Sequence, residues 1–334
     1  MSGFEGNGRP LLEVEDLVVR YRVARGLSGT ILRRPQRHVH AVSGVSLTVA
    51  RGEMVALVGE SGCGKTTTAQ AILRLVHADS GRVSFDGLDV MSLPQDELRA
   101  LRRRMQIIYQ DPYESLDPRF RVSTTVAEPL VIHRIGSRSE RRKAVDRALE
   151  QVGLAPAELF ADRFPPELSG GQRQRVAIAS SLVLAPDLLV ADEPVSMLDV
   201  SVRAGILGIL DELRDQGLAV LMITHDLSTA ARFADRICVM YLGRIVEEGP
   251  AREVIDKPRH PYTKALLSVV PRRDPRHRAE LEILKGETPN PIEVPTGCRF
   301  HPRCPVAISA CRETDPELRA AAGERGHRAA CILA

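Results

Sequence analysis

Short apolar runs alternate with amphipathic stretches along the first 250 residues. Residues 12–19 (LEVEDLVV) alternate partly between apolar and polar positions, as an antiparallel strand does. Residues 54–58 (MVALV) are apolar throughout, which is typical of a central strand in a parallel sheet. The spacing in residues 66–76 is helical. These patterns predict an α/β protein.

The remaining patterns refine this class. From about residue 89 to 182 the apolar spacing is mostly helical, which indicates a helical subdomain inserted into the core. Strands alternating with helices after that point favour a parallel sheet covered by helices, beside an antiparallel β subdomain. The further predicted strands are residues 42–49, 82–85, 106–109, 188–191, 219–223 and 237–241.

The composition changes after Pro250. The segment beyond it is rich in proline and holds four of the six cysteines. We therefore predict a main domain over residues 1–255 and a Pro/Cys-rich C-terminal extension over residues 256–334. The basic, Gly/Pro-punctuated residues 22–37 are interpreted as a surface loop of unassigned role.

Charge and hydropathy exclude several classes. There are 46 Lys and Arg against 43 Asp and Glu, a net charge of +3, which gives no electrostatic case for nucleic acid as the main ligand. No apolar run approaches the roughly 20 residues that span a bilayer, and the N-terminal residues do not have the layout of a secretion signal. A cytoplasmic location is expected, so the cysteines are thiols or metal ligands rather than disulfides.

Residues 59–66 (GESGCGKT) predict a phosphate-binding loop. They match G-x-x-x-x-G-K-[ST] between an apolar strand and a helix, which is the context that makes this pattern specific. Backbone N–H groups of the loop and the helix N-terminus face phosphate oxygens, and Lys65 neutralises the β- and γ-phosphates. The Thr66 hydroxyl is a candidate Mg²⁺ ligand. The ATP-binding residues expected here are Ser61, Gly62, Cys63, Gly64, Lys65, Thr66 and Thr67.

A second apolar strand ends in two acids, in residues 188–193 (LLVADE). A carboxylate at the end of a buried strand requires a partner, and a cation supplies it. We expect Asp192 to hold Mg²⁺ and Glu193 to be the base that orients or deprotonates the attacking water. The alternative is a pair of solvent-facing acids, which the phosphate loop makes the weaker interpretation.

Residues 168–172 (LSGGQ), followed by RQRVAIA, resemble the signature motif of ABC ATPases. The motif is a second Gly-rich helix start that offers donors to a γ-phosphate. The resemblance implies that Ser169, Gly170, Gly171 and Gln172 act in trans, on the nucleotide held by a partner subunit. One chain would then not complete a site.

The other elements of this family follow in order. Tyr21 is similar to the aromatic residue that stacks on adenine, and Gln110 in IIYQD to the glutamine that contacts Mg²⁺ and water. His225 in ITHD matches the switch histidine that contacts the γ-phosphate. Residues 196–199 (SMLD) resemble the loop between the two sites, with Met197 where alanine is more usual. All catalytic positions are intact, so the resemblance implies active, Mg²⁺-dependent ATP hydrolysis, with Glu193 and His225 catalytic.

Three further strings narrow the branch. Residues 110–119 (QDPYESLDPR), 260–271 (HPYTKALLSVVP) and 298–305 (CRFHPRCP) resemble the ATPases of bacterial oligopeptide and dipeptide importers, over nearly the whole chain. This implies a second, nonidentical ABC ATPase in a heterodimer, two transmembrane permease subunits, an extracytoplasmic solute-binding protein, and a place on the cytoplasmic face of the membrane. The alternative solutes are nickel, glutathione or opine-like compounds.

The four cysteines of the extension are Cys298, Cys304, Cys311 and Cys331, spaced C-x5-C-x6-C-x19-C. Four thiolates suit Zn²⁺ or an iron–sulfur cluster, and the open spacing weakens the zinc interpretation. The resemblance implies a [4Fe–4S] cluster, with zinc and unmetallated thiols as alternatives. Cys63 and Cys238 are assigned to packing.

Other functional classes fit less well. A soluble ABC ATPase acting on nucleic acid has long insertions or two fused motor domains in one chain, and neither pattern is in this sequence. An exporter motor is usually fused to membrane helices or lacks such a tail. A pure metal- or cluster-binding regulator would have no use for the intact catalytic set.

Overall fold

The computed structural model describes residues 9–23, 36–111, 116–269, 284, 286–320 and 326–334. They form two compact units, treated separately below. The first unit comprises the described residues of Met1–Thr48, Val55–Ser92 and Thr224–Ala334, and the second comprises those of Val49–Met54 and Leu93–Ile223. Within the described ranges, no helix has both the length and the apolar character needed to cross a membrane.

The first unit contains the predicted antiparallel sheet, with the strand order β2-β1-β4-β5. Strands β1 and β4 are antiparallel, with Leu12 opposite Phe85. Leu12, Val14, Leu17 and Val19 of β1 are buried while Glu15, Asp16, Arg20 and Arg22 are exposed, which agrees with the partly alternating pattern. The bounds are β1 Leu12–Arg22, β2 His38–Val49, β4 Ser80–Phe85 and β5 Leu88–Asp89.

A second set of strands in the first unit carries the phosphate-binding loop. The order is β11-β12-β10-β9-β3, in which β3 and β9 are parallel and β9 and β10 antiparallel. Every residue of β3 is buried, as predicted for a central strand. The bounds are β3 Met54–Val58, β9 Arg236–Tyr241, β10 Arg244–Pro250, β11 Arg319–Ala320 and β12 Arg328–Ala329.

The helices of the first unit are α2 Lys65–Ile72, α10 Leu227–Phe233, α11 Ala251–Asp256 and α12 Pro261–Ser268. Helix α2 is shorter than the helical pattern of residues 66–76 predicted. It ends because Arg74 takes a left-handed conformation, with φ of 52°, and the Leu75 N–H then bonds back to the Gln70 carbonyl. Such a left-handed residue closes a helix by satisfying its last carbonyls.

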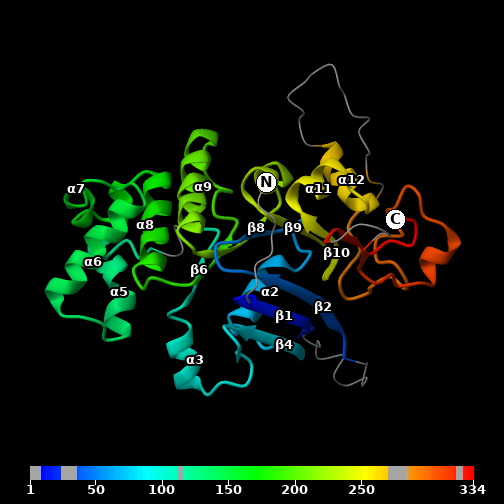
Figure 1. Ribbon diagram of the computed structural model, residues 1–334, viewed down its shortest axis with the longest axis horizontal. Coiled ribbons are helices and arrows are strands. Elements are labelled where there is room, and N and C mark those ends of the chain that lie inside the picture. The colour runs from blue at the N-terminus through cyan, green and yellow to red at the C-terminus, as the bar shows by residue number, and fades with distance from the viewer. Residues whose placement is uncertain (1–8, 24–35, 112–115, 270–283, 285, 321–325) are drawn as a thin grey trace, which may run out of the picture. The chain divides into compact units, whose positions relative to one another are not determined.

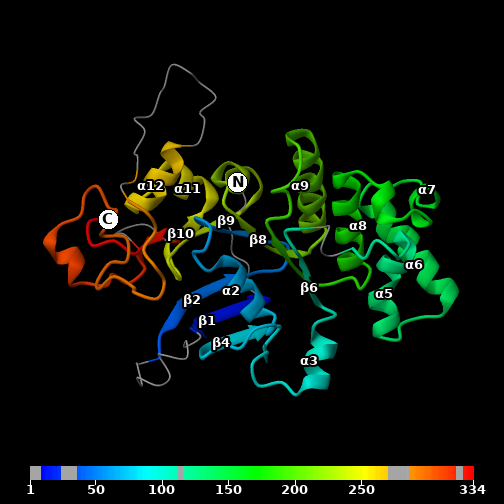
Figure 2. The ribbon, with the colours of Figure 1, turned by 180° about the vertical axis from the view of Figure 1, so that it is seen from behind.

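The second unit contains three parallel strands in the order β8-β7-β6 and most of the helices. Helices α5 to α8 pack together as a group (Figures 1 and 2), which is the helical segment that the apolar spacing predicted. The bounds are β6 Met105–Ile108, β7 Leu188–Asp192, β8 Ala219–Thr224, α3 Gln95–Leu101, α5 Val122–Ile132, α6 Arg138–Gln151, α7 Glu158–Ala161, α8 Gly170–Leu182 and α9 Val200–Asp215.

The C-terminal part of the extension packs on β10 through β12, and it lies beside α12 (Figure 1). The fully buried Glu247 of β10 fixes three parts of the chain. Its carboxylate accepts hydrogen bonds from the backbone N–H groups of Arg259 and His260, and it lies 2.7 Å from Nε2 of His327 on the far side of the extension. These contacts join the extension to β10. The extension and the N-terminal strands belong to the same compact unit, while the division near residue 255 stays a prediction.

Parts of three sequence predictions lie outside the described residues. These are residues 24–35 of the basic loop, 112–115 of the QDPYESLDPR string, and 270–271 of the HPYTKALLSVVP string. The two ends of the basic loop are joined, because the Val23 N–H donates to the Arg37 carbonyl at 3.0 Å.

Candidate functional site

The phosphate-binding loop connects β3 to α2 in the first unit, and close packing determines its shape. Gly62 and Gly64 have positive φ values of 77° and 108°. A Cβ on Gly64 would lie 2.2 Å from the carbonyl oxygen of Ala41, and one on Gly59 would lie 2.2 Å from that of Met240. Only glycine permits this approach, so the loop backbone lies directly against its neighbours.

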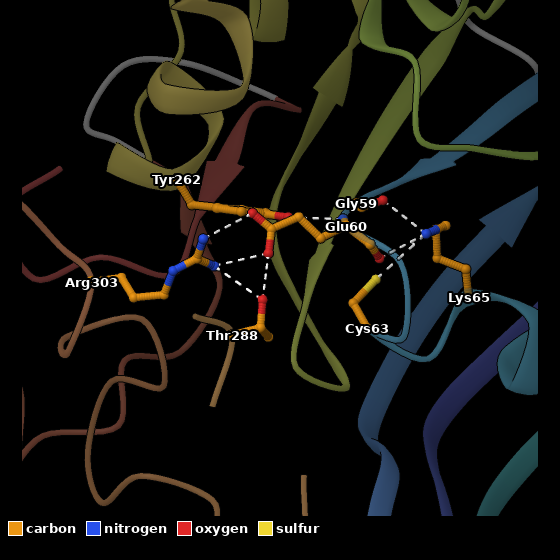
Figure 3. Close-up of polar contacts among 7 residues, drawn as sticks. All are labelled: Gly59, Glu60, Cys63, Lys65, Tyr262, Thr288 and Arg303. Atoms are coloured by element: carbon orange, nitrogen blue, oxygen red, sulfur yellow. Dashed lines mark hydrogen bonds and ion pairs between the residues drawn. The ribbon is translucent and has the colours of Figure 1, made fainter. Parts of the chain in front are cut away.

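Lys65 points into the loop. Its side chain is buried, and Nζ donates hydrogen bonds to the carbonyls of Gly59 at 2.8 Å and Glu60 at 2.9 Å (Figure 3). The ammonium is thus held beside the backbone that would surround a phosphate. The Ser61 and Thr66 side chains are exposed, so the Thr66 hydroxyl is accessible to a metal ion. Cys63 is buried, and burial raises the pKa of its thiol, as expected for a packing residue.

Glu60 anchors this loop to the C-terminal extension, a role that the sequence patterns did not indicate. Its carboxylate accepts hydrogen bonds from Arg303 at 2.8 and 3.2 Å and from Thr288 at 2.7 Å, and its N–H donates to the Tyr262 hydroxyl at 2.9 Å (Figure 3). Burial alone would raise the pKa of Glu60, but the Arg303 and Thr288 hydrogen bonds and the Arg303 and Lys65 charges lower it overall.

Arg303, Thr288 and Tyr262 lie more than 200 residues from Glu60 in the sequence. The HPYTKALLSVVP and CRFHPRCP strings contain Tyr262 and Arg303, and they were the available signal for this contact. That signal identified the branch of the family but gave no partner for either residue.

The second unit brings a predicted Mg²⁺-contacting residue and a predicted catalytic residue together at the end of β7. The Gln110 amide donates to the Glu193 carboxylate at 3.2 Å. Glu193 has a positive φ of 46°, and its N–H donates to the Ile223 carbonyl at 2.9 Å. A left-handed glutamate is strained, and such residues occur often at functional sites. The adjacent Asp192 is buried, as a metal-binding carboxylate at a strand end would be.

The signature segment forms the start of α8 in the second unit. Ser169 is the N-cap: its hydroxyl accepts from the Gln172 N–H, and the Gln172 side chain accepts from the Ser169 N–H at 3.0 Å. Gly170 and Gly171 are the first residues of the helix. Ser169 is exposed, so this N-terminus faces solvent with its donors available for a phosphate.

His225 and Tyr21 lie in the first unit. His225 is exposed in the turn between β8 and α10. Its neighbour Asp226 caps α10 by accepting from the Ser228 N–H at 2.8 Å, and its own N–H donates to the Thr224 hydroxyl. Burial would raise the pKa of Asp226, but the Thr229 and Ser228 hydrogen bonds lower it overall. Tyr21, at the end of β1, is 40% exposed, which leaves its ring available for stacking.

The four cysteines of the extension line one cavity. Its walls include Cys298, Cys304, Cys311 and Cys331 together with His260, Phe300 and His301. Burial and the neighbouring Cys311 and Cys331 raise the pKa of the Cys298 thiol. None of the six cysteines, all of which are described, forms a disulfide.

The thiols are gathered but not arranged as ligands. Among the described residues, no three His, Cys, Asp or Glu side chains are arranged to hold a metal ion. The donor types nonetheless suit a soft metal centre, because four cysteines line a single cavity.

The comparisons with known proteins match both parts of the chain. A family model described as ABC transporter matches residues 42–196, and one described as oligopeptide/dipeptide transporter, C-terminal region, matches residues 246–311. A putative peptide import ATP-binding protein of Brucella ovis is 46% identical over 97% of this chain and 98% of its own length. The chain belongs to the ABC transporter family.

Two further similarities extend this assignment. The oligopeptide transport ATP-binding protein AppF of Bacillus subtilis is 42% identical over 98% of both chains. A solved dimeric ATP-binding cassette, MJ0796 in a post-hydrolysis state with ADP and Pi, aligns with a TM-score of 0.63 and 31% identity, over 72% of this chain and 99% of that one. The ABC ATPase fold predicted from the sequence is confirmed, and this ABC protein is an ATPase that drives transport.

Proposed function

We propose that this ABC protein is the ATP-hydrolysing subunit of an importer for oligopeptides or dipeptides. The observation that carries the proposal is the C-terminal region, residues 246–311, which matches that of oligopeptide/dipeptide transporters and follows an intact ATPase core. Relatives similar over nearly their full length are named as peptide-import and oligopeptide-transport ATP-binding proteins. Nickel, glutathione or another solute would use the same motor.

In this proposal, the first unit binds ATP. Residues 61–67 surround the phosphates, Lys65 neutralises them, and Tyr21 stacks on adenine. Thr66 supplies a ligand to Mg²⁺, and His225 contacts the γ-phosphate. The positive φ values of Gly62 and Gly64 and the accessible Thr66 hydroxyl support this assignment.

The second unit supplies the remaining groups. Asp192 and Gln110 complete the Mg²⁺ and water contacts, and Glu193 orients the attacking water in line with the γ-phosphorus and accepts its proton. The 3.2 Å bond between Gln110 and Glu193 supports their acting together. Ser169 and the adjacent signature residues bind the γ-phosphate of the nucleotide on the partner subunit.

The partners follow from this trans arrangement. A second ABC ATPase, most simply a nonidentical one, completes each site. Two permease subunits and an extracytoplasmic solute-binding protein would provide the pathway and select the solute, and the chain would lie on the cytoplasmic face of the membrane. The similar cassette whose solved structure is dimeric supports the pairing of two ATPase subunits.

The extension would hold a [4Fe–4S] cluster on Cys298, Cys304, Cys311 and Cys331, with zinc as the alternative. The common cavity of these four residues supports this assignment. When bound, the cluster would have a structural or regulatory role, because hydrolysis requires no electrons. Anaerobic purification followed by iron, sulfide and zinc analysis would test it. Iron and sulfide in near-equal amounts, lost in Cys304→Ser, are expected, and a metal-free protein with intact ATPase activity would contradict the cluster.

The transport function is tested with Glu193→Gln in the complex reconstituted with its permease subunits in vesicles. We expect ATP turnover and peptide uptake to fall at least about 100-fold while the ATP dissociation constant changes little, because a general base contributes a factor of this order. Unlabelled peptides should compete for uptake, while nickel and glutathione should not. Competition by nickel or glutathione alone would replace the peptide assignment and leave the motor role intact.

A further inference from the structure

We propose that Arg303 is a positioning residue for the phosphate-binding loop, and that loading of the cysteine cavity with a metal centre changes ATP affinity through it. The loading part rests on the proposed metal centre, whereas the positioning part does not. Both parts concern only residues of the first unit.

The contact is specific and largely buried. The Arg303 side chain is 9% exposed, and its two terminal nitrogens both bond the Glu60 carboxylate. Nη1 also donates to the Thr288 hydroxyl at 3.3 Å, and the guanidinium carbon lies 5.9 Å from the centre of the Tyr241 ring. A two-point bond between a guanidinium and a carboxylate fixes orientation as well as distance.

Glu60 transmits this constraint to the nucleotide site. Its carboxylate is fixed by Arg303, its N–H by Tyr262, and its carbonyl accepts from the Lys65 ammonium at 2.9 Å (Figure 3). Arg303 is thus connected through one residue to the cation that neutralises the ATP phosphates. A shift of the guanidinium would move the carbonyl that holds Lys65.

Arg303 also balances a charge. Without it, the half-buried Glu60 carboxylate would place an uncompensated negative charge within the loop that binds a polyanion. The expected penalty therefore grows with the charge of the nucleotide. Loss of a purely structural contact would instead lower the binding affinity for every nucleotide by a similar factor.

The same guanidinium is next to the cysteine cavity along the chain. Residues 298–304 form successive tight turns, in which the His301 N–H bonds the Cys298 carbonyl at 3.0 Å and the Arg303 N–H bonds the Phe300 carbonyl at 3.0 Å. Cys304 follows Arg303 directly. Because Cys298 and Cys304 lie in the same turns as Arg303, a metal bound by these thiols would act on the backbone that carries Arg303.

The test measures the dissociation constants of a fluorescent ATP analogue and of ADP for the full chain. Arg303→Met should weaken ATP binding roughly 10-fold and ADP binding less, because the unpaired Glu60 carboxylate opposes the more highly charged nucleotide more strongly. Arg303→Lys should recover part of the loss. The double variant Glu60→Gln with Arg303→Met should recover only part of the ATP affinity, because it removes the uncompensated charge but does not restore the two-point bond that positions Glu60.

Arg328→Met is the matched control. Arg328 pairs with the buried Glu248 and so joins the same extension to β10. Unlike the Arg303 pair, this ion pair includes no residue of the phosphate-binding loop. Its ATP affinity should stay within twofold of the wild type. Equal losses in Arg303→Met and Arg328→Met, or full recovery in the double variant, would overturn the positioning role.

The loading part is tested by comparing metal-loaded and metal-free protein. ATP affinity should differ at least threefold between the two forms of the wild type and should be equal in Arg303→Met, which retains all four cysteines. Equal affinities in the wild type would overturn the coupling, as would a chain that binds no metal. The latter result would also remove the proposed cluster, while the positioning role would still be decided by the nucleotide measurements.

Discussion

This chain has two glycine-rich segments that begin helices, and they are stabilised in opposite ways. The phosphate-binding loop before α2 has distant neighbours: its glycines lie against the carbonyls of Ala41 and Met240, and Tyr262 and Arg303 hold Glu60. The signature segment before α8 is stabilised locally, because Ser169 and Gln172 cap each other.

The difference shows which substitutions each segment tolerates. A loop shaped by backbone from other strands cannot adjust when a side chain is added, since those strands are part of the core. A helix start stabilised by its own cap loses only the cap energy when one partner is removed. Both segments are glycine-rich backbone at a helix start, but the first depends on distant neighbours within the first unit.

The largest effect is expected for Gly64→Ala. The new Cβ would approach the Ala41 carbonyl oxygen to 2.2 Å at a φ of 108°, so both sterics and backbone strain oppose it. We expect a loss of about 3–5 kcal/mol in the free energy of unfolding, measured by denaturant titration. Gly62→Ala is the control, because its Cβ meets nothing within 4 Å and only its φ of 77° opposes it, at about 1–2 kcal/mol. Equal losses would contradict the role of Ala41.

A second variant separates a side-chain obstacle from a backbone one. A Cβ on Gly171 would lie 2.4 Å from Cγ1 of Val202, which belongs to α9 and can be truncated. Gly171→Ala should cost about 1–3 kcal/mol through overpacking, and Val202→Ala should relieve it. A double-mutant cycle should give a favourable coupling of about 1–2 kcal/mol.

The corresponding cycle in the phosphate loop should show little relief. The Met240 side chain also lies near a Cβ on Gly64, at 2.9 Å, but the Ala41 carbonyl remains when it is truncated. Gly64→Ala with Met240→Ala should therefore stay as unstable as Gly64→Ala alone. A full rescue would show that the obstacle is the side chain rather than the backbone.

The same contrast explains how far the sequence could predict the structure. The loop pattern of residues 59–66 and the fully apolar strand before it are local signals, and β3 and the start of α2 confirm them. The contact between Glu60 and Arg303 joins residues 243 positions apart, and no periodicity encodes such a pair. Strand β10 was also missed, because Glu247 and Glu248 interrupt its apolar pattern.

Those two acids are buried because each has a partner from the extension. His327 and two backbone N–H groups surround Glu247, and Arg328 pairs with Glu248. A charged residue in a buried strand is stable only with such partners. Sequence reasoning placed the four extension cysteines as a group, and they line one cavity, but their arrangement around a metal stays a prediction.

The contacts that hold the phosphate-binding loop should weaken at low pH, whereas the local cap of the signature segment should not. His260 begins α12 and accepts from the N–H of Tyr262, the residue that holds Glu60, and burial lowers the pKa of His260 to about 3. In the unfolded chain this imidazole takes up a proton near pH 6.5, whereas in the folded chain it stays neutral. Its contribution to the unfolding free energy is therefore complete above pH 6.5 and decreases as the pH falls.

The measurement compares the wild type with His260→Asn, whose amide oxygen can accept the same hydrogen bond. Between pH 7.5 and 5.5 the wild type should lose about 1 kcal/mol of unfolding free energy more than the variant, since a titration of this size follows from an unfolded pKa near 6.5. If the unfolding free energies of the two proteins change in parallel with pH, the buried imidazole of His260 is not the cause of the pH dependence.

The smallest expected change is in Ser169→Ala, which removes the hydroxyl of the local cap. The helix start should lose about 0.5–1 kcal/mol of stability, the usual value for a capping serine. Ser137→Ala is the matched control, because Ser137 and Glu140 form the same reciprocal cap at the start of α6. Both variants should lower the unfolding free energy equally, but only Ser169→Ala should reduce ATP turnover in the assembled dimer, where its hydroxyl would meet the partner's nucleotide. If turnover falls equally in both, Ser169 acts through helix stability alone, and the signature segment contributes no hydroxyl to the γ-phosphate.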